Sequence, residues 1–203
     1  MHHDNIEWAD DIDAKRNAIK EADKKLFKAG DDRCPAETWK GYLYHDGTHV
    51  VIPQDNFASM LMKAGARVTL KGKTTYKSLT QSSILFEQMY MAFFSNGTTL
   101  AWKAIDEITG DFKAQADRVK ALGFRLFMKR AAIGQAKHVR VRPRFEQWSV
   151  EGSFEVIDDA VTDDVLQRIW EEAGKYIGLC DWRPGSKQSP GPYGRFVATL
   201  KKV

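Results

Sequence analysis

Apolar and polar residues alternate most clearly in the last third of the chain. Over positions 138–145, "HVRVRPRF", Val139, Val141 and Phe145 fall on one side, and histidine or arginine falls on the other. This alternation predicts a half-buried β-strand. The pattern resumes at Trp148 and continues to Val156, which predicts a second strand.

A helix is predicted after these strands. Thr162 is a suitable N-cap, and two aspartates follow it, as the first turn of a helix favours. Apolar residues then recur at helical spacing until Gly178, where we expect the helix to end. The segment "RFVATLKK" at 195–202 indicates a final strand, so the order is strand, strand, helix, loop, strand.

The earlier pattern is less regular. Apolar spacing predicts a helix in the N-terminal segment, and Asp46-Gly47 between two short apolar runs predicts a hairpin. We expect a helix capped by Asp55 after Pro53. Positions 67–94 are rich in β-branched and aromatic residues and indicate strands and loops. Positions 99–124 are polar and weakly periodic, which indicates a loop or a mobile insertion.

This mixture of helices and strands is typical of the α+β class. Nothing in the composition marks a linker, so we expect a single domain over 1–203, with an N-terminal helical segment at 1–36 and an inserted region at 95–135. No apolar run approaches the length of a membrane span, and the N-terminus is polar and acidic. The expectation is a cytoplasmic protein without membrane association.

Few residues suggest a metal, a cofactor or a redox role. The two cysteines, Cys34 and Cys180, are too few for a disulfide framework, so we expect reduced thiols. His45 and His49 flank a turn without a third ligand nearby in the sequence, so surface histidines are the preferred interpretation. We expect no cofactor and no metal.

Positive charge is segregated along the chain. The net charge is +4, but positions 113–144 hold ten basic residues and one acidic residue, so this window carries +9 and the rest of the chain −5. Positions 56–86 hold five basic residues and no acidic residue. Segregated basic charge is typical of proteins that bind polyanions such as nucleic acid. The alternative is a solvated surface that happens to be basic.

A loop rich in glycine and proline lies between the expected last helix and the expected last strand. Gly178, Gly185, Gly191 and Gly194 are spaced along it together with basic residues. Glycines let a backbone approach a ligand closely and leave amides for phosphate. The alternative is that Gly178 is only the C-cap of the helix, which explains one glycine of the four.

The strand at 138–145 offers a second set of cations. Arg140, Arg142 and Arg144 lie on one face with no acidic residue between them, and the alternative to ligand binding is cross-strand pairing with Glu151 and Glu155. Aromatic residues near these cations in the sequence are suited to stacking on bases. The candidate nucleic-acid-binding residues are Arg140, Arg142, Arg144, Gly178, Trp182, Arg183, Lys187, Gly191, Tyr193, Gly194, Arg195, Lys63, Arg67, Lys71 and Lys73.

The glycine-rich loop before an expected last strand resembles the repeat-associated mysterious proteins (RAMPs) of CRISPR systems. "GPYGRF" at 191–196 is similar to the family's loop, and Ile52-Pro53 with the helix from Asp55 is similar to an early strand and helix of the family. "RPRFEQWSV", "IGLCDWRPGS" and "YGRF" together also resemble uncharacterised phage-encoded proteins. The resemblance covers 39–62 and 139–203. It implies a ferredoxin-like or RRM-like antiparallel sheet with helices on one face, and RNA binding.

The chain departs from the RAMP pattern in its proline-rich loop, in Cys180, and in lacking a second ferredoxin-like half. The first hypothesis is therefore a non-catalytic protein that binds single-stranded nucleic acid, RNA in preference to DNA. It would be phage-encoded, act in the host cytoplasm, and coat its ligand as a homo-oligomer or filament. The second is a metal-independent RAMP-type endoribonuclease using His45, His49 or His138 as acid or base. The third is a protein-interaction module, either structural or directed against a host defence complex, whose basic face meets an acidic partner.

Overall fold

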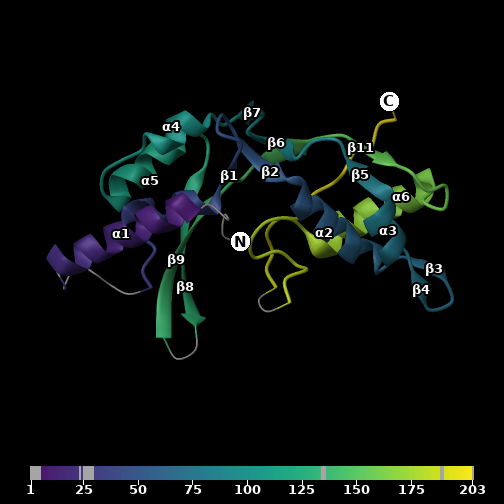
Figure 1. Cartoon of the computed structure of the whole chain (residues 1–203), viewed down its shortest axis with the longest axis horizontal. Helices are drawn as coiled ribbons and strands as arrows, with labels where there is room; N and C mark the ends of the chain where they lie inside the picture. Colours follow the sequence, from purple (N-terminus) through teal and green to yellow (C-terminus); the bar gives the residue numbers. More distant parts are fainter. Residues whose placement is uncertain (1–5, 23, 25–29, 134–135, 188–189, 203) are drawn as a thin grey trace. The chain divides into compact units, whose positions relative to one another are not determined.

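The computed structural model combines helices with antiparallel β-sheets (Figure 1), which confirms the α+β class. It describes residues 6–22, 24, 30–133, 136–187 and 190–202. Two compact units are present. Unit 1 comprises Met1–Ile52 and Ala92–Glu151, and unit 2 comprises Pro53–Met91 and Gly152–Val203. The single domain expected from the sequence, with its inserted region, stays a prediction.

The larger sheet lies mainly in unit 1. Its strands follow the order β1-β2-β6-β10, and β7 also pairs with β6. These strands are β1 (Tyr44–His45), β2 (Val50–Pro53), β6 (Tyr90–Ser95), β7 (Thr98–Thr99) and β10 (Trp148–Glu151). Tyr44 pairs with Val51 in an antiparallel register, so the hairpin at Asp46-Gly47 is confirmed.

A separate two-stranded ribbon in unit 1 is made by β8 (Arg125–Ile133) and β9 (Ala136–Arg144), which run side by side in Figure 1. The strand expected at 138–145 is therefore confirmed. The helices of the unit are α1 (Ile6–Ala22), the 3-10 helix η1 (Ala36–Tyr42), α4 (Trp102–Asp106) and α5 (Phe112–Ala121).

The loop expected at 99–124 is wrong, because this segment forms α4 and α5. The Asp111 carboxylate caps α5 by accepting a hydrogen bond from the amide of Ala114 at 2.8 Å. α5 also has a buried polar residue, Gln115, whose side chain accepts a hydrogen bond from the Trp39 indole at 2.8 Å. Because Trp39 and Phe124 are buried beside each other, this weakly periodic segment is held in helices by tertiary packing.

Unit 2 has an aromatic core. Each of the rings of Phe57, Phe86, Phe154, Trp170 and Phe196 packs against another ring of this group, with centroid separations of 5.7–6.4 Å. The elements that carry or surround this core are α2 (Gln54–Gly65), β3 (Thr69–Lys71), β4 (Thr74–Thr75), α3 (Lys77–Ser83), β5 (Ile84–Phe86), β11 (Phe154–Val156), α6 (Asp163–Glu172) and the π-helix η2 (Ala173–Ile177).

Several boundaries differ from those expected. The strand expected over 148–156 is two strands, because β10 pairs with β6 whereas β11 pairs with β5. Thr162 caps α6 as predicted, whereas α2 begins after Pro53 with no side-chain cap from Asp55. The final strand expected at 195–202 is wrong, since this segment joins no sheet. In the described part of the chain, no helix is long and apolar enough to cross a membrane.

Candidate nucleic-acid interface

The register of the β8–β9 ribbon collects basic side chains on one face. Residues directly opposite each other in an antiparallel pair project to the same side, and the next pair along projects to the other side. We call this side the basic face. Its cross-strand pairs are Arg125 with Arg144, Phe127 with Arg142, Lys129 with Arg140, and Ala131 with His138.

A buried carboxylate holds two of these arginines in place. Asp32 is only 1% exposed, and its oxygens accept hydrogen bonds from Nη1 of Arg140 and Nη1 of Arg142, each at 3.0 Å. It also accepts the backbone amide of Val141 at 3.1 Å. Two guanidinium groups thus share one carboxylate, so positive charge remains in excess at this point.

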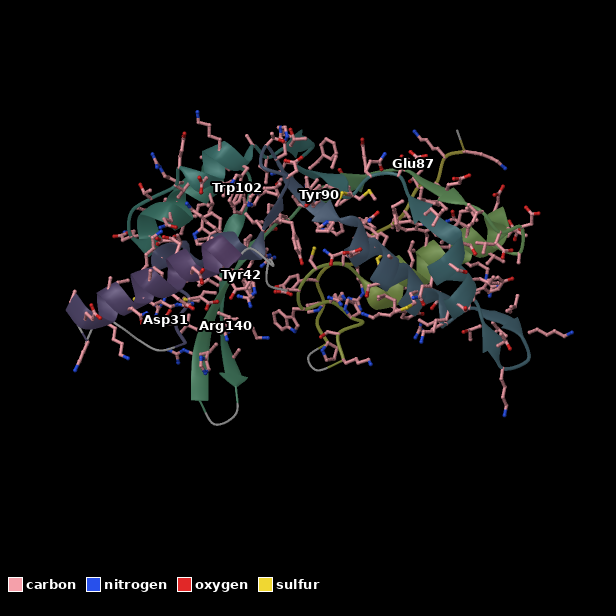
Figure 2. The ribbon with its side chains drawn as sticks, viewed as in Figure 1. Asp31, Tyr42, Glu87, Tyr90, Trp102 and Arg140 are labelled. Atoms are coloured by element: carbon pink, nitrogen blue, oxygen red, sulfur yellow. The ribbon has the colours of Figure 1, made fainter. Side chains whose placement is uncertain are left out.

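The segment that carries Asp32 lies along the outer edge of β9. The amide of Asp32 donates to the carbonyl of Val139 at 2.9 Å, and the amide of Val139 donates to the carbonyl of Gly30 at 3.0 Å. Beside it, Asp31 pairs with Arg33 at 2.6 Å. Asp31 and Arg140 are labelled beside the ribbon in Figure 2. This edge of β9 is consequently covered over 139–141.

The β9 arginines do not pair with the glutamates of the following strands, which was the alternative to ligand binding. β9 pairs with β8 and β10 pairs with β6, so no cross-strand pairing with Glu151 or Glu155 forms. Arg144 instead lies 3.4 Å from the carboxylate of Glu146 in an exposed ion pair. The alternation itself is confirmed, because Val141 is fully buried whereas the arginine side chains are 28–38% exposed.

Aromatic rings accompany the arginines. The guanidinium carbon of Arg142 lies 3.5 Å from the centre of the Tyr42 ring, and the Tyr42 hydroxyl donates to Asp32 at 3.3 Å. Burial raises the pKa of Tyr42 above its ordinary value, against the opposing effect of Arg142, so the hydroxyl keeps its proton at neutral pH. The guanidinium of Arg144 lies 5.7 Å from the ring of Phe127.

The glycine-rich loop of unit 2 folds back on itself. Gly178 and Gly194 have positive φ, and a Cβ at Gly194 would collide with the carbonyl oxygen of Leu179. The amide of Leu179 donates to the carbonyl of Gly194 at 2.9 Å, and the amide of Gly191 to that of Arg183 at 3.1 Å. The glycines therefore have an explanation inside the protein, and their contact with a ligand stays a prediction.

The side chains of this loop are also engaged internally. Arg183 donates to the carbonyl of Cys180 at 2.7 Å, and Arg195 donates to the carbonyls of Lys175 and Pro192 at 3.2 and 3.3 Å. The rings of Trp182 and Tyr193 pack edge to face with centroids 5.4 Å apart. These contacts hold the described part of the loop but leave Arg183 partly accessible, and Arg195 and Lys187 exposed.

The structure brings Lys63 close to this loop. The pKa of Lys63 is lowered by burial and further by the positive charges of Arg183 and Lys187, so three predicted residues gather here. Arg67 pairs with Glu172 at 2.6 Å and lies 4.5 Å from the ring of Tyr176.

Lys71 and Lys73 are exposed on the β3–β4 hairpin. The predicted residues thus fall into two groups: Arg140, Arg142 and Arg144 belong to unit 1, and all the others belong to unit 2.

The histidines considered as acids or bases occupy two places. His45 stacks on Trp102 with centroids 3.8 Å apart, and burial lowers its pKa. His49 lies exposed beside Thr48. His138 is on the basic face, and its Nδ1 is buried without a hydrogen-bond partner. Among the described residues, no group of three or more His, Cys, Asp or Glu side chains is placed to hold a metal ion.

Sequence reasoning missed Asp32, Tyr42, Arg125, Phe127 and Lys129. The alternation of Arg125, Phe127 and Lys129 along "RLFMK" matches that of β9, and this signal was present in the sequence. The sequence holds no comparable signal for Asp32, because its arginine partners lie 108 and 110 residues away.

Known proteins provide no further guide to this site. No family model matches the sequence, and neither a curated protein nor a solved structure is significantly similar to the chain.

Proposed function

We propose that this chain binds single-stranded nucleic acid, with RNA as the expected ligand, and does not cleave it. The observation that supports this proposal best is the basic face of the β8–β9 ribbon. It presents five cations together with aromatic rings within about 14 Å along the ribbon. Cations neutralise phosphates, and aromatic rings accept stacked bases.

The charge balance on this face favours a polyanion. Asp32 compensates at most one of the two arginines that it contacts, and Glu146 is exposed beside Arg144. Surface ion pairs of this last kind contribute about 0–1 kcal/mol, so a phosphate group can compete for Arg144. Arg125 and Lys129 add two exposed cations on the neighbouring strand.

The covered edge of β9 favours a single strand over a duplex groove. The major groove of B-DNA accommodates a two-stranded ribbon. Here the segment around Asp32 forms an isolated bridge to β9 and lies along its outer edge over 139–141, so the middle of the ribbon is wider than two strands. A flexible single strand can instead lie across the basic face.

The proposal also covers the basic residues of unit 2 and the relation of the chain to the RAMP family. Lys63, Arg183 and Lys187 would provide another phosphate contact in unit 2, supported by their closeness. The relation to RAMPs and a ferredoxin-like arrangement are also proposals, supported by the antiparallel sheets and by the glycine-rich loop that follows η2. Coating of the ligand by a homo-oligomer, and a phage origin, rest on the sequence resemblance alone.

The salt dependence of binding tests this proposal. Affinity for a fluorescent single-stranded RNA should fall steeply between about 50 and 200 mM salt, because phosphate neutralisation releases counterions. Arg125→Ala combined with Lys129→Ala should weaken binding to all sequences alike. The double variant should also reduce the slope of log affinity against log salt by about one for each phosphate that is no longer neutralised.

The matched control is Lys103→Ala, which removes an exposed cation of α4 and should leave both affinity and slope unchanged. Binding that is absent at low salt, or that does not respond to salt, would refute the proposal and favour an acidic protein partner. Equal reductions of affinity in the ribbon variant and in Lys103→Ala would place the nucleic-acid site away from the basic face.

A further inference from the structure

The segment 195–202 alternates in side-chain exposure, as a β-strand does, but joins no sheet. Val197 is 95% exposed, whereas the ring of Phe196 packs against Trp170 with centroids 6.3 Å apart. The amide of Phe196 donates to a carbonyl of η2 at 3.3 Å. Beyond it, residues 197–201 make no backbone hydrogen bond in the described structure, and Figure 1 draws them as coil at the yellow end of the chain. Unpaired amides and carbonyls of this kind are a template for a further strand.

β11 offers a second unpaired edge in the same unit. It pairs with β5 on one side, and its other side has no partner strand among the described residues. Leu85 of β5 lies opposite Glu155, and Ile157 follows two residues later, so the three side chains share one face. Leu85 and Ile157 are 46% and 58% exposed. This edge is therefore bordered by apolar side chains in contact with water.

The two edges carry opposite charges. The segment 195–202 has Arg195, Lys201 and Lys202 and no acidic residue, whereas positions 155–159 have three acidic residues and no basic residue. Antiparallel pairing of 195–202 with another copy of itself would bring the cations of its two ends together, and like charges opposite each other are destabilising. Pairing with β11 brings opposite charges together instead.

One antiparallel register matches the two edges on both faces. In this register every cross-strand pair joins residues of the same exposure class, so exposed side chains meet on one face and half-buried side chains meet on the other. A slip of one residue would turn one strand over relative to the other and lose this match. The pairs are Val197 with Ile157, Arg195 with Asp159 and Thr199 with Glu155 on the exposed face, and Ala198 with Val156 and Leu200 with Phe154 on the other.

We propose that residues 195–202 of one copy of this chain add as an antiparallel strand to β11 of a second copy. Each copy then offers one strand and one edge, so the contact is head-to-tail, the kind that builds rings or filaments. This inference rests on the coating role in the proposed function and gives that role an interface.

Analytical ultracentrifugation of the full chain without nucleic acid tests the contact. Wild type should associate as its concentration rises over an about hundredfold range, because association follows mass action. Val197→Asp places an acid opposite the acidic edge, and Ile157→Lys places a base opposite the basic strand, so each variant should stay monomeric by itself. Both side chains are exposed, so the fold should be retained, which circular dichroism checks.

A mixture of the two variants is the decisive sample. Val197→Asp keeps an intact edge and Ile157→Lys keeps an intact strand, so the mixture should associate although neither component does. Leu70→Asp is the matched control, because Leu70 is an exposed apolar residue of β3 in the same unit. This control should associate as wild type does.

The contact is refuted if wild type stays monomeric over the whole range, if either single variant associates like wild type, or if the mixture stays monomeric. None of these results bears on nucleic-acid binding, because the samples contain none. Conversely, a chain that associates in this way but binds no RNA at low salt would refute the proposed function and leave the contact between copies standing.

Discussion

Asp32 is the residue on which the geometry of the basic face depends. A carboxylate that is 1% exposed has lost nearly all of its hydration, and only charged or polar partners can compensate this loss. Here Arg140, Arg142 and the amide of Val141 provide them. Removing the acid would leave two arginines that are about one-third exposed with no shared counter-charge.

We therefore predict that Asp32→Asn lowers the free energy of unfolding by about 2–3 kcal/mol. This is less than the full cost of breaking a buried pair, because water can partly solvate the arginines. Urea titration measures the change. Glu146→Gln removes the exposed partner of Arg144 and should cost less than about 1 kcal/mol, so equal destabilisation of the two variants would contradict this role of Asp32.

Asp46 makes a second residue-scale prediction, in the β1–β2 hairpin. Its carboxylate accepts hydrogen bonds from the amides of Thr48 and His49 and from the Thr48 hydroxyl, and these lower its pKa to about 2. The folded pKa is thus below the unfolded value of 3.8, so the stabilisation is complete above about pH 4 and is lost as the pH falls towards 2.

Asp46→Ala should accordingly lower the melting temperature at pH 7, and its difference from wild type should shrink as the pH falls from about 4 to 2. Thermal unfolding followed by circular dichroism over this range provides the measurement. A difference that is constant with pH would mean that the hydrogen bonds of the carboxylate do not stabilise the hairpin.

At the scale of elements, the described residues of the loop from Gly178 to Arg195 bond to one another and to the helix before them. Its amides and carbonyls bond across the loop, from Gly178 to Ala173, from Leu179 to Gly194 and from Gly185 to Ile177. Gly194 adopts φ +72°, and its backbone contacts that of Leu179 too closely for any side chain. The loop therefore needs glycine for its own closure, whether or not a ligand binds.

Gly194→Val is predicted to lower the melting temperature by about 5–10 °C, because it combines backbone strain of about 1–3 kcal/mol with a collision at Leu179. Gly47→Val is the control, since Gly47 also has a positive φ but nothing lies within 4 Å of a Cβ there. The control should show the strain alone. Equal decreases in the two variants would argue against the close approach.

At the scale of the whole molecule, charge is separated within unit 1. The segment Met1–Ile52 has eight basic and eleven acidic residues, whereas Ala92–Glu151 has eleven basic and six acidic residues. The basic face belongs to the second segment, and Asp32 of the first segment neutralises only part of it. This separation gives the face a local field that the net charge of +4 conceals.

We predict no cleavage of single-stranded RNA or DNA, with or without magnesium. General acid–base cleavage uses groups that hold and release a proton near neutral pH at the reacting phosphate. In the described part of the basic face, His138 is the one histidine, while His45 and His49 lie on the β1–β2 hairpin. Gel analysis of labelled strands measures this. Discrete products that disappear in His138→Ala would instead establish the endoribonuclease hypothesis.

Local patterns in the sequence were sufficient for much of the secondary structure. Alternation at 138–145 predicted β9, Asp46-Gly47 predicted the β1–β2 hairpin, and Thr162 predicted the start of α6. These features depend on side-chain periodicity, turn preference and capping, which act over a few residues. The arginines of β9 were named as candidates for the same reason, because their shared face follows from a period of two.

Tertiary structure decided which elements pair and which residues complete the site. The segment at 99–124 became α4 and α5 because Trp39 and Phe124 pack there and Gln115 bonds to Trp39, although its own periodicity is weak. The segment at 195–202 has a strand pattern but no neighbouring strand to bond with. Asp32 and Tyr42 reach Arg142 across about half the chain. Contacts between residues so distant in sequence leave no local pattern, because burial and charge compensation are properties of the assembled core.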